Sequence, residues 1–92
     1  MHTDKVATWY GMTRTHGFHI EIRRDTATGE YVADLQTSTP PLVPQHIPGT
    51  PVETMQFDDP EQLRHEDLDF LRALLEQRIT ERCGEIIQFI AR

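Results

Sequence analysis

The side chains that could carry catalysis are few in this sequence and widely spaced. The single cysteine, Cys83, could act as a nucleophile only beside a base, which for a thiol is usually a histidine. Cys83 lies in an apolar segment, however, where a thiolate is poorly stabilised. We therefore interpret it as a small buried hydrophobic residue and expect no covalent catalysis there.

Five histidines are present and could bind a metal ion if the fold brought them together. His16 and His19 are three residues apart, so in one strand their side chains would point to opposite faces. His2, His46 and His65 are scattered along the chain. We expect exposed histidines of ordinary behaviour, with a small metal-binding protein as an alternative hypothesis.

Motifs of known chemistry are absent from the sequence. It holds no glycine-rich phosphate loop, Walker lysine, nucleophile elbow or HExxH motif. Lys5 is the only lysine, which disfavours Schiff-base chemistry. The sequence therefore predicts a protein that is not an enzyme and uses no cofactor.

The charge is acidic, with a net value of −6 and a pI near 5.2, which argues against direct nucleic-acid binding. Carboxylates crowd residues 58–69. Among them Asp58, Asp59 and Glu61 could contact a basic protein partner, although a solvated helix start explains the same residues without one.

We expect the rest of the chain to pack on the segment from Asp67 to Arg92. This segment alone combines sustained apolar periodicity with the absence of proline. Asp67 is a suitable N-cap. Apolar residues then recur at spacings of three and four, as in an amphipathic helix. We predict a helix over 67–91. These apolar residues are Leu68, Phe70, Leu71, Leu74, Leu75, Ile79, Cys83, Ile86, Ile87, Phe89 and Ile90.

The apolar stripe of this predicted helix rotates by roughly 100° between its two halves, at about 100° per residue. A straight helix of about 37 Å could not bury both halves on one small sheet. Either the helix breaks, with Gly84 as the weak point, or its second half packs on a second copy of the chain. The residues that we predict for this homodimer contact are Ile79, Cys83, Ile86, Ile87 and Ile90.

Residues 5–37 predict a meander of three strands. Phe18, Ile20 and Ile22 alternate with polar residues, which is typical of a strand buried on one face. Residues 25–29 suit a hairpin loop closed by Gly29 in the left-handed region.

Pairing residues whose numbers sum to 55 sets Ile22 opposite Ala33 and Ile20 opposite Leu35, so turn and hydrophobic register agree. The opposite face should meet solvent, and it carries His19, Glu21, Arg23, Val32, Asp34 and Gln36.

The middle of the chain is less regular. Residues 38–51 hold five of the six prolines and predict a loop, either a connector or a binding arm. Residues 52–57 predict a fourth strand with Met55 and Phe57 inward. Residues 58–65 predict a short helical turn, with Pro60 at its first position.

We thus expect one α+β domain over residues 1–92: a small antiparallel sheet of three to four strands with a long C-terminal helix on one face. No apolar run could span a membrane and no signal peptide is evident, so we expect a cytoplasmic protein. We expect it to act through protein–protein contacts as a homodimer. The alternative is an inhibitor, antitoxin-like or immunity-like protein that neutralises a basic or nucleic-acid-binding partner through its acidic residues.

Overall fold

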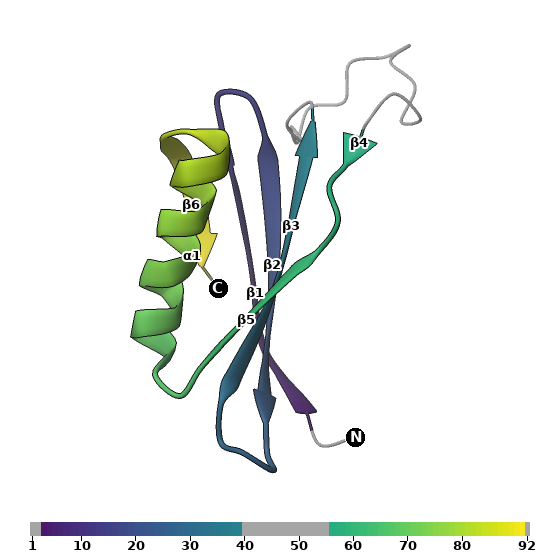
Figure 1. Ribbon diagram of the computed structural model, residues 1–92, viewed down its shortest axis with the longest axis vertical. Helices are drawn as coiled ribbons and strands as arrows, with labels where there is room; N and C mark the ends of the chain where they lie inside the picture. The colour runs from purple at the N-terminus through teal and green to yellow at the C-terminus, as the bar shows by residue number, and fades with distance from the viewer. Residues whose placement is uncertain (1–2, 40–55, 92) are drawn as a thin grey trace.

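The computed structural model describes residues 3–39 and 56–91. Their elements are β1 (Thr3–Thr13), β2 (Gly17–Asp25), β3 (Tyr31–Thr39), β4 (Gln56–Phe57), β5 (Glu61–His65), α1 (Leu68–Cys83) and β6 (Ile86–Ala91). The strands form one antiparallel sheet in the order β4-β3-β2-β1-β6, with β5 also pairing with β3. Helix α1 lies along one face of this twisted sheet (Figure 1). The predicted α+β architecture is confirmed, but three to four strands were too few.

The hairpin of β2 and β3 has the predicted register. Ile22 pairs with Ala33, and Ile20 pairs with Leu35. Gly29 closes the loop with φ of 76°, and its N–H donates to the Asp25 carbonyl oxygen at 2.7 Å. Turn chemistry and burial therefore specify the same pairing.

Strand β1 joins the other side of β2 and has a bulge between Lys5 and Ala7. The bulge explains why β1 lacks strict alternation, since Val6 is an extra residue there. Beyond the bulge, Trp9 is buried on the α1 side, and its neighbour Tyr10 is partly exposed on the other side.

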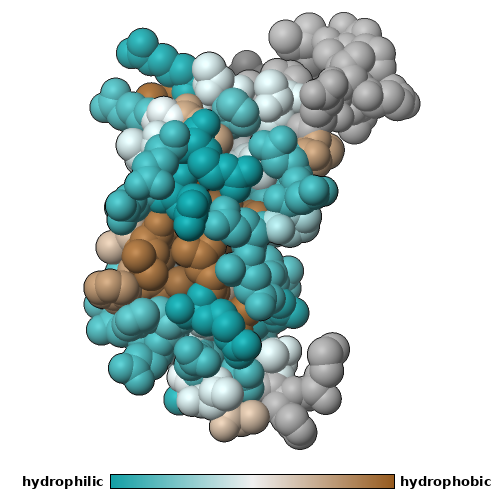
Figure 2. Space-filling model, in the orientation of Figure 1, coloured by the Kyte–Doolittle hydropathy of each residue, from teal (hydrophilic) through white to brown (hydrophobic). Residues whose placement is uncertain are grey.

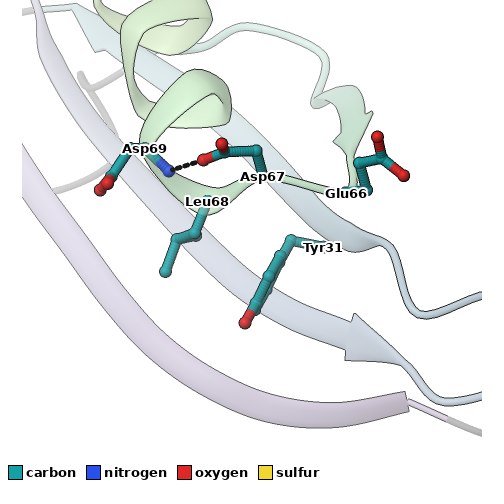
Figure 3. Close-up of a pocket in the computed structure, with 5 residues that line it drawn as sticks. All are labelled: Tyr31, Glu66, Asp67, Leu68 and Asp69. Atoms are coloured by element: carbon teal, nitrogen blue, oxygen red, sulfur yellow. Dashed lines mark hydrogen bonds between the residues drawn. The ribbon is translucent and has the colours of Figure 1, made fainter.

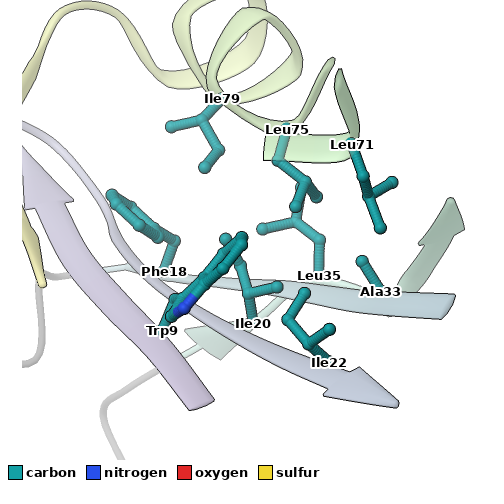
Figure 4. Close-up of a cluster of buried hydrophobic side chains, with 9 residues drawn as sticks. All are labelled: Trp9, Phe18, Ile20, Ile22, Ala33, Leu35, Leu71, Leu75 and Ile79. Carbon is teal, nitrogen blue, oxygen red and sulfur yellow. The ribbon is translucent and has the colours of Figure 1, made fainter. Parts of the chain in front are cut away.

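The core lies between α1 and the face of the sheet that α1 covers (Figure 4). Leu71, Leu75 and Ile79 lie four residues apart on α1, and none has exposed surface. The sheet contributes the remaining buried residues, which are Trp9, Phe18, Ile20, Ile22, Ala33 and Leu35.

The C-terminal segment differs from the prediction. Helix α1 ends at Cys83, because Gly84 adopts φ of 91° and its N–H closes the last turn on the Thr80 carbonyl oxygen at 3.0 Å. The helix does break at the expected glycine, but the prediction of helix as far as residue 91 was wrong. Residues 86–91 are rich in β-branched and aromatic side chains and form strand β6. The apolar stripe rotates along this segment because its first part is helix α1 and its last part is strand β6.

The segment before α1 also differs. Residues 61–65 form strand β5 rather than a helical turn, with Leu63 opposite Ala33 and packed against the core. The prediction failed because this strand is specified by long-range pairing with β3. Phe57, expected inward, is 52% exposed at the end of β4. Residues 52–55 and 40–51 lie outside the described residues, while Ser38 and Thr39 extend β3.

The second face of the sheet carries no helix of the described residues, and we call it the uncovered face. Where β2 and β3 form it, this face carries the predicted polar residues, and Val32 among them is buried. Arg23 and Arg64 lie directly opposite Val32 on the two neighbouring strands. Their aliphatic stems explain why Val32 is shielded without a second layer.

Candidate functional site

Strand β6 lies at the end of the sheet, and among the described strands it pairs only with β1. Trp9 pairs with Ala91, Tyr10 with Ile90, and the ladder continues to Thr13. No strand of the described residues lies on the other side of β6, which we call the free edge of β6. Backbone N–H and C=O groups on such an edge can pair with another chain.

The side chains of β6 carry no charge, since its sequence is IIQFIA. Ile87 lies at a bulge in the ladder and is 55% exposed. Gln88 and Ile90 lie on the uncovered face, opposite Met12 and Tyr10 of β1. The free edge of β6 is therefore apolar as well as unpaired.

Phe89 anchors this strand on the core. Its ring centroid lies 5.9 Å from that of Trp9 and 5.5 Å from that of Phe18, in tilted contacts. The Arg72 guanidinium of α1 lies over the ring, 4.7 Å from its centroid. The same Arg72 is held by Glu76, with Nε 3.1 Å from the carboxylate. Strand β6 is thus supported by both the sheet and the helix.

The edge of β5 and the part of β1 that β6 does not pair carry charges. On β5, Glu61 forms ion pairs with Arg78 and Arg82, and Arg64 binds Asp25 at 2.7 Å. The part of β1 that β6 does not pair carries Asp4, Lys5 and the bulge. Charged side chains and bulges are common protections against edge-to-edge pairing. Among the described strand edges of this length, β6 alone lacks a charge.

The predicted acidic contact residues are largely occupied within the chain. Glu61 binds Arg78 at 3.2 Å and Arg82 at 2.8 Å. Asp58 accepts a hydrogen bond from the Thr37 hydroxyl at 2.6 Å, and its N–H donates to the Thr37 carbonyl oxygen. Only Asp59 makes no ion pair or hydrogen bond with another residue of the described ranges. These contacts weaken the hypothesis of an acidic surface for a basic partner.

An open depression lies at the start of α1, lined by Tyr31, Glu66, Asp67, Leu68 and Asp69 (Figure 3). Asp67 is the N-cap, as predicted, and its Oδ1 accepts from the N–H groups of Asp69 at 2.9 Å and Phe70 at 3.2 Å. This capping accounts for the Asp67 carboxylate without a ligand.

Hydrophobic side chains also reach the surface on the side of the molecule where α1 lies (Figure 2). On α1, exposed Phe70 stacks on His65 with ring centroids 4.3 Å apart. His65 Nδ1 also accepts from the Asp67 N–H at 2.9 Å. Both contacts close the turn from β5 into α1, which is a structural role.

The three histidines of the described residues and the cysteine do not form a cluster of metal-ligating side chains. Within residues 3–39 and 56–91 there is no cluster of three or more metal-ligating side chains. His16 lies in the β1–β2 turn beside Thr15, whereas His19 lies on the uncovered face. Burial raises the pKa of the Cys83 thiol, which disfavours the nucleophilic thiolate. His2 and His46 lie outside the described residues.

The residues predicted for a homodimer contact separate into two groups. Ile79 is fully buried, and Cys83 and Ile86 pack against the core, so these three are poorly placed to meet a partner. Ile87 and Ile90 lie on β6 next to its free edge. The edge itself was missed because this segment was predicted as helix, although its strand-forming composition after Gly84 was the available signal.

No protein-family model matches this chain, and the comparisons with curated proteins and with solved structures found no match. Among the described residues, α1 is too short and too polar to cross a lipid bilayer.

Proposed function

We propose that the protein is a non-enzymatic interaction module that binds another protein chain by adding a strand to the free edge of β6. The observation that carries this proposal is the combination of an unpaired edge, an uncharged sequence and the exposed Ile87. In strand addition, backbone hydrogen bonds supply affinity and alternate side chains supply specificity.

The support beneath β6 favours binding. Because Phe89 is fixed between Trp9, Phe18 and Arg72, the strand is held in place before a partner arrives. A preorganised strand loses less conformational entropy on binding than a mobile one.

The uncovered face beside β6 offers further contact. Ile90, Tyr10 and His19 form one cross-strand row there, and none of the three makes a side-chain hydrogen bond or ion pair with another described residue. Farther from β6 the polar groups already bind each other, since Asp34 pairs with Arg23 and accepts from Gln62 at 3.2 Å. A partner whose strand pairs with β6 would therefore have the row of Ile90, Tyr10 and His19 as the adjacent surface for its other residues.

To test this proposal, the protein is immobilised and the proteins that it retains are identified. Two variants are compared, each with a substitution of one exposed apolar residue, and the two residues lie at opposite edges of the sheet. Ile87 is 55% and Phe57 52% exposed, so Ile87→Lys and Phe57→Lys are matched changes that leave the core intact. Proteins retained from the native host, including the chain itself, should be lost with Ile87→Lys and kept with Phe57→Lys. Equal retention by both folded variants would contradict the proposal.

A further inference from the structure

We infer that the strand which occupies the free edge of β6 belongs to a second copy of this chain, paired antiparallel about a two-fold axis at Phe89. The inference rests on the proposed function, and it names the partner at that edge.

The charge distribution favours self-pairing at this edge. Two copies, each with a net charge of −6, repel one another across most of their surfaces. Like charges placed directly opposite on paired strands are destabilising. Because none of the six residues of β6 is charged, two copies of this strand can approach without that cost.

The bulge selects the register. Directly opposite residues of antiparallel strands lie on the same face of the sheet. With the axis at Phe89, Gln88 lies opposite Ile90 of the second copy, and both residues belong to the uncovered face. An axis at Gln88 would instead set Ile90 opposite Ile86, which pairs with Thr13 and packs toward α1. An axis at Phe89 therefore places residues of the same face opposite one another, and an axis at Gln88 does not.

The same register places the two Phe89 rings next to each other on the α1 face. Each ring already contacts Trp9 and Phe18, so pairing extends an existing aromatic cluster across the axis. An isologous contact of this kind uses the same edge in both copies. Because this two-fold contact occupies the edge of β6 in both copies, the assembly closes as a dimer. One strand pair is smaller than a standard interface of roughly 1,600 Å², so the dissociation constant should be on the order of micromolar.

Sedimentation velocity over about 1–100 µM tests the pairing, a range that brackets the expected dissociation constant. Gln88→Lys and Gln62→Lys are matched changes, because both glutamines are exposed on the uncovered face at opposite edges of the sheet. The unmodified chain should show a reversible monomer–dimer equilibrium. Gln88→Lys should weaken it by about twofold to fivefold by placing like charges diagonally across the axis, whereas Gln62→Lys should not change it.

Disulfide trapping tests the register. In a Cys83→Ser background, mixing Gln88→Cys with Ile90→Cys under oxidised glutathione should give the mixed covalent dimer. Rapid cross-linking of Gln88→Cys with itself would overturn the axis at Phe89.

The outcomes separate this inference from the proposed function. A chain that stays monomeric at every concentration, while Ile87→Lys abolishes binding of a different protein, would overturn the second-copy inference alone. A dimer that Gln88→Lys leaves unchanged would also overturn it. A monomer whose binding to other proteins is insensitive to Ile87→Lys would overturn both.

Discussion

The substitution Gly11→Ala tests the contact that holds β6 in place. Gly11 pairs with Phe18 on one side and Phe89 on the other. A Cβ at residue 11 would lie 2.0 Å from the Gln88 carbonyl oxygen and 2.6 Å from Cζ of Phe18. Contacts below 3.0 Å do not occur, and the Gln88 oxygen belongs to the backbone, so β6 must move by about 1 Å or detach.

The expected cost follows from these distances. Overpacking costs about 1–3 kcal/mol, and each backbone hydrogen bond lost from the β1–β6 ladder adds about 1 kcal/mol. We therefore expect Gly11→Ala to lower the free energy of unfolding by about 2–4 kcal/mol. A chain of 92 residues is stable by roughly 5–14 kcal/mol, so the variant should still fold.

Urea unfolding followed by circular dichroism measures this change, and Gly29→Ala is its control. A Cβ at Gly29 meets nothing within 4 Å, but its φ of +76° is unfavourable for alanine by about 1–2 kcal/mol. Gly11→Ala should lower the free energy of unfolding more than Gly29→Ala does. The new Cβ at residue 11 collides with the backbone of β6, whereas alanine at residue 29 only adopts an unfavourable φ. A cost for Gly11→Ala equal to or below that of Gly29→Ala would refute the β1–β6 contact.

Three further predictions concern stability. Leu75→Ala should lower the free energy of unfolding by about 2–5 kcal/mol in urea, because Leu75 has no exposed surface; a loss below about 1 kcal/mol would contradict the packing of α1. Asp67→Ala should cost about 1 kcal/mol through loss of the N-cap, and Asp67→Asn should restore most of it; equal unfolding midpoints for the two variants would argue against the cap. The Ala27 backbone N–H, with Arg64, lowers the pKa of Asp25 below its ordinary 3.8, so the folded state gains stability above that value and loses it as pH falls through the folded-state pKa. Acid unfolding of Asp25→Asn should therefore show a shallower loss of stability in this range, and an unchanged acid limb would contradict the Asp25 contacts.

The parts of the fold that could be predicted are those specified by neighbouring residues. The β2–β3 register follows from alternation around Ile20 and Ile22 together with Gly29 at the turn. The helix start follows from Asp67 and the apolar spacing after it. In each case the local residue chemistry and the burial pattern favour the same structure, so this structure can be predicted from a single sequence.

The parts that failed depend on contacts between distant segments. The four apolar residues of the predicted stripe after Gly84 fit a helix as well as a strand, and only pairing with β1 decides between them. Strand β5 has a single apolar residue, Leu63, so its pairing with β3 leaves little local signal. Of the predicted contact residues on β6, Ile87 and Ile90 stay in the proposed surface, whereas Ile86 packs against the core. Ile79 of α1 is fully buried in the core.

Amide hydrogen exchange of β6 as a function of protein concentration tests the central claim most directly, since it reports the strand edge itself. Outward-facing amides within Ile86–Ala91 should exchange quickly in dilute solution and become protected as concentration rises through the micromolar range, while exchange in β3 stays constant. Rapid exchange of those amides at every concentration would contradict pairing of the free edge of β6 with a second copy.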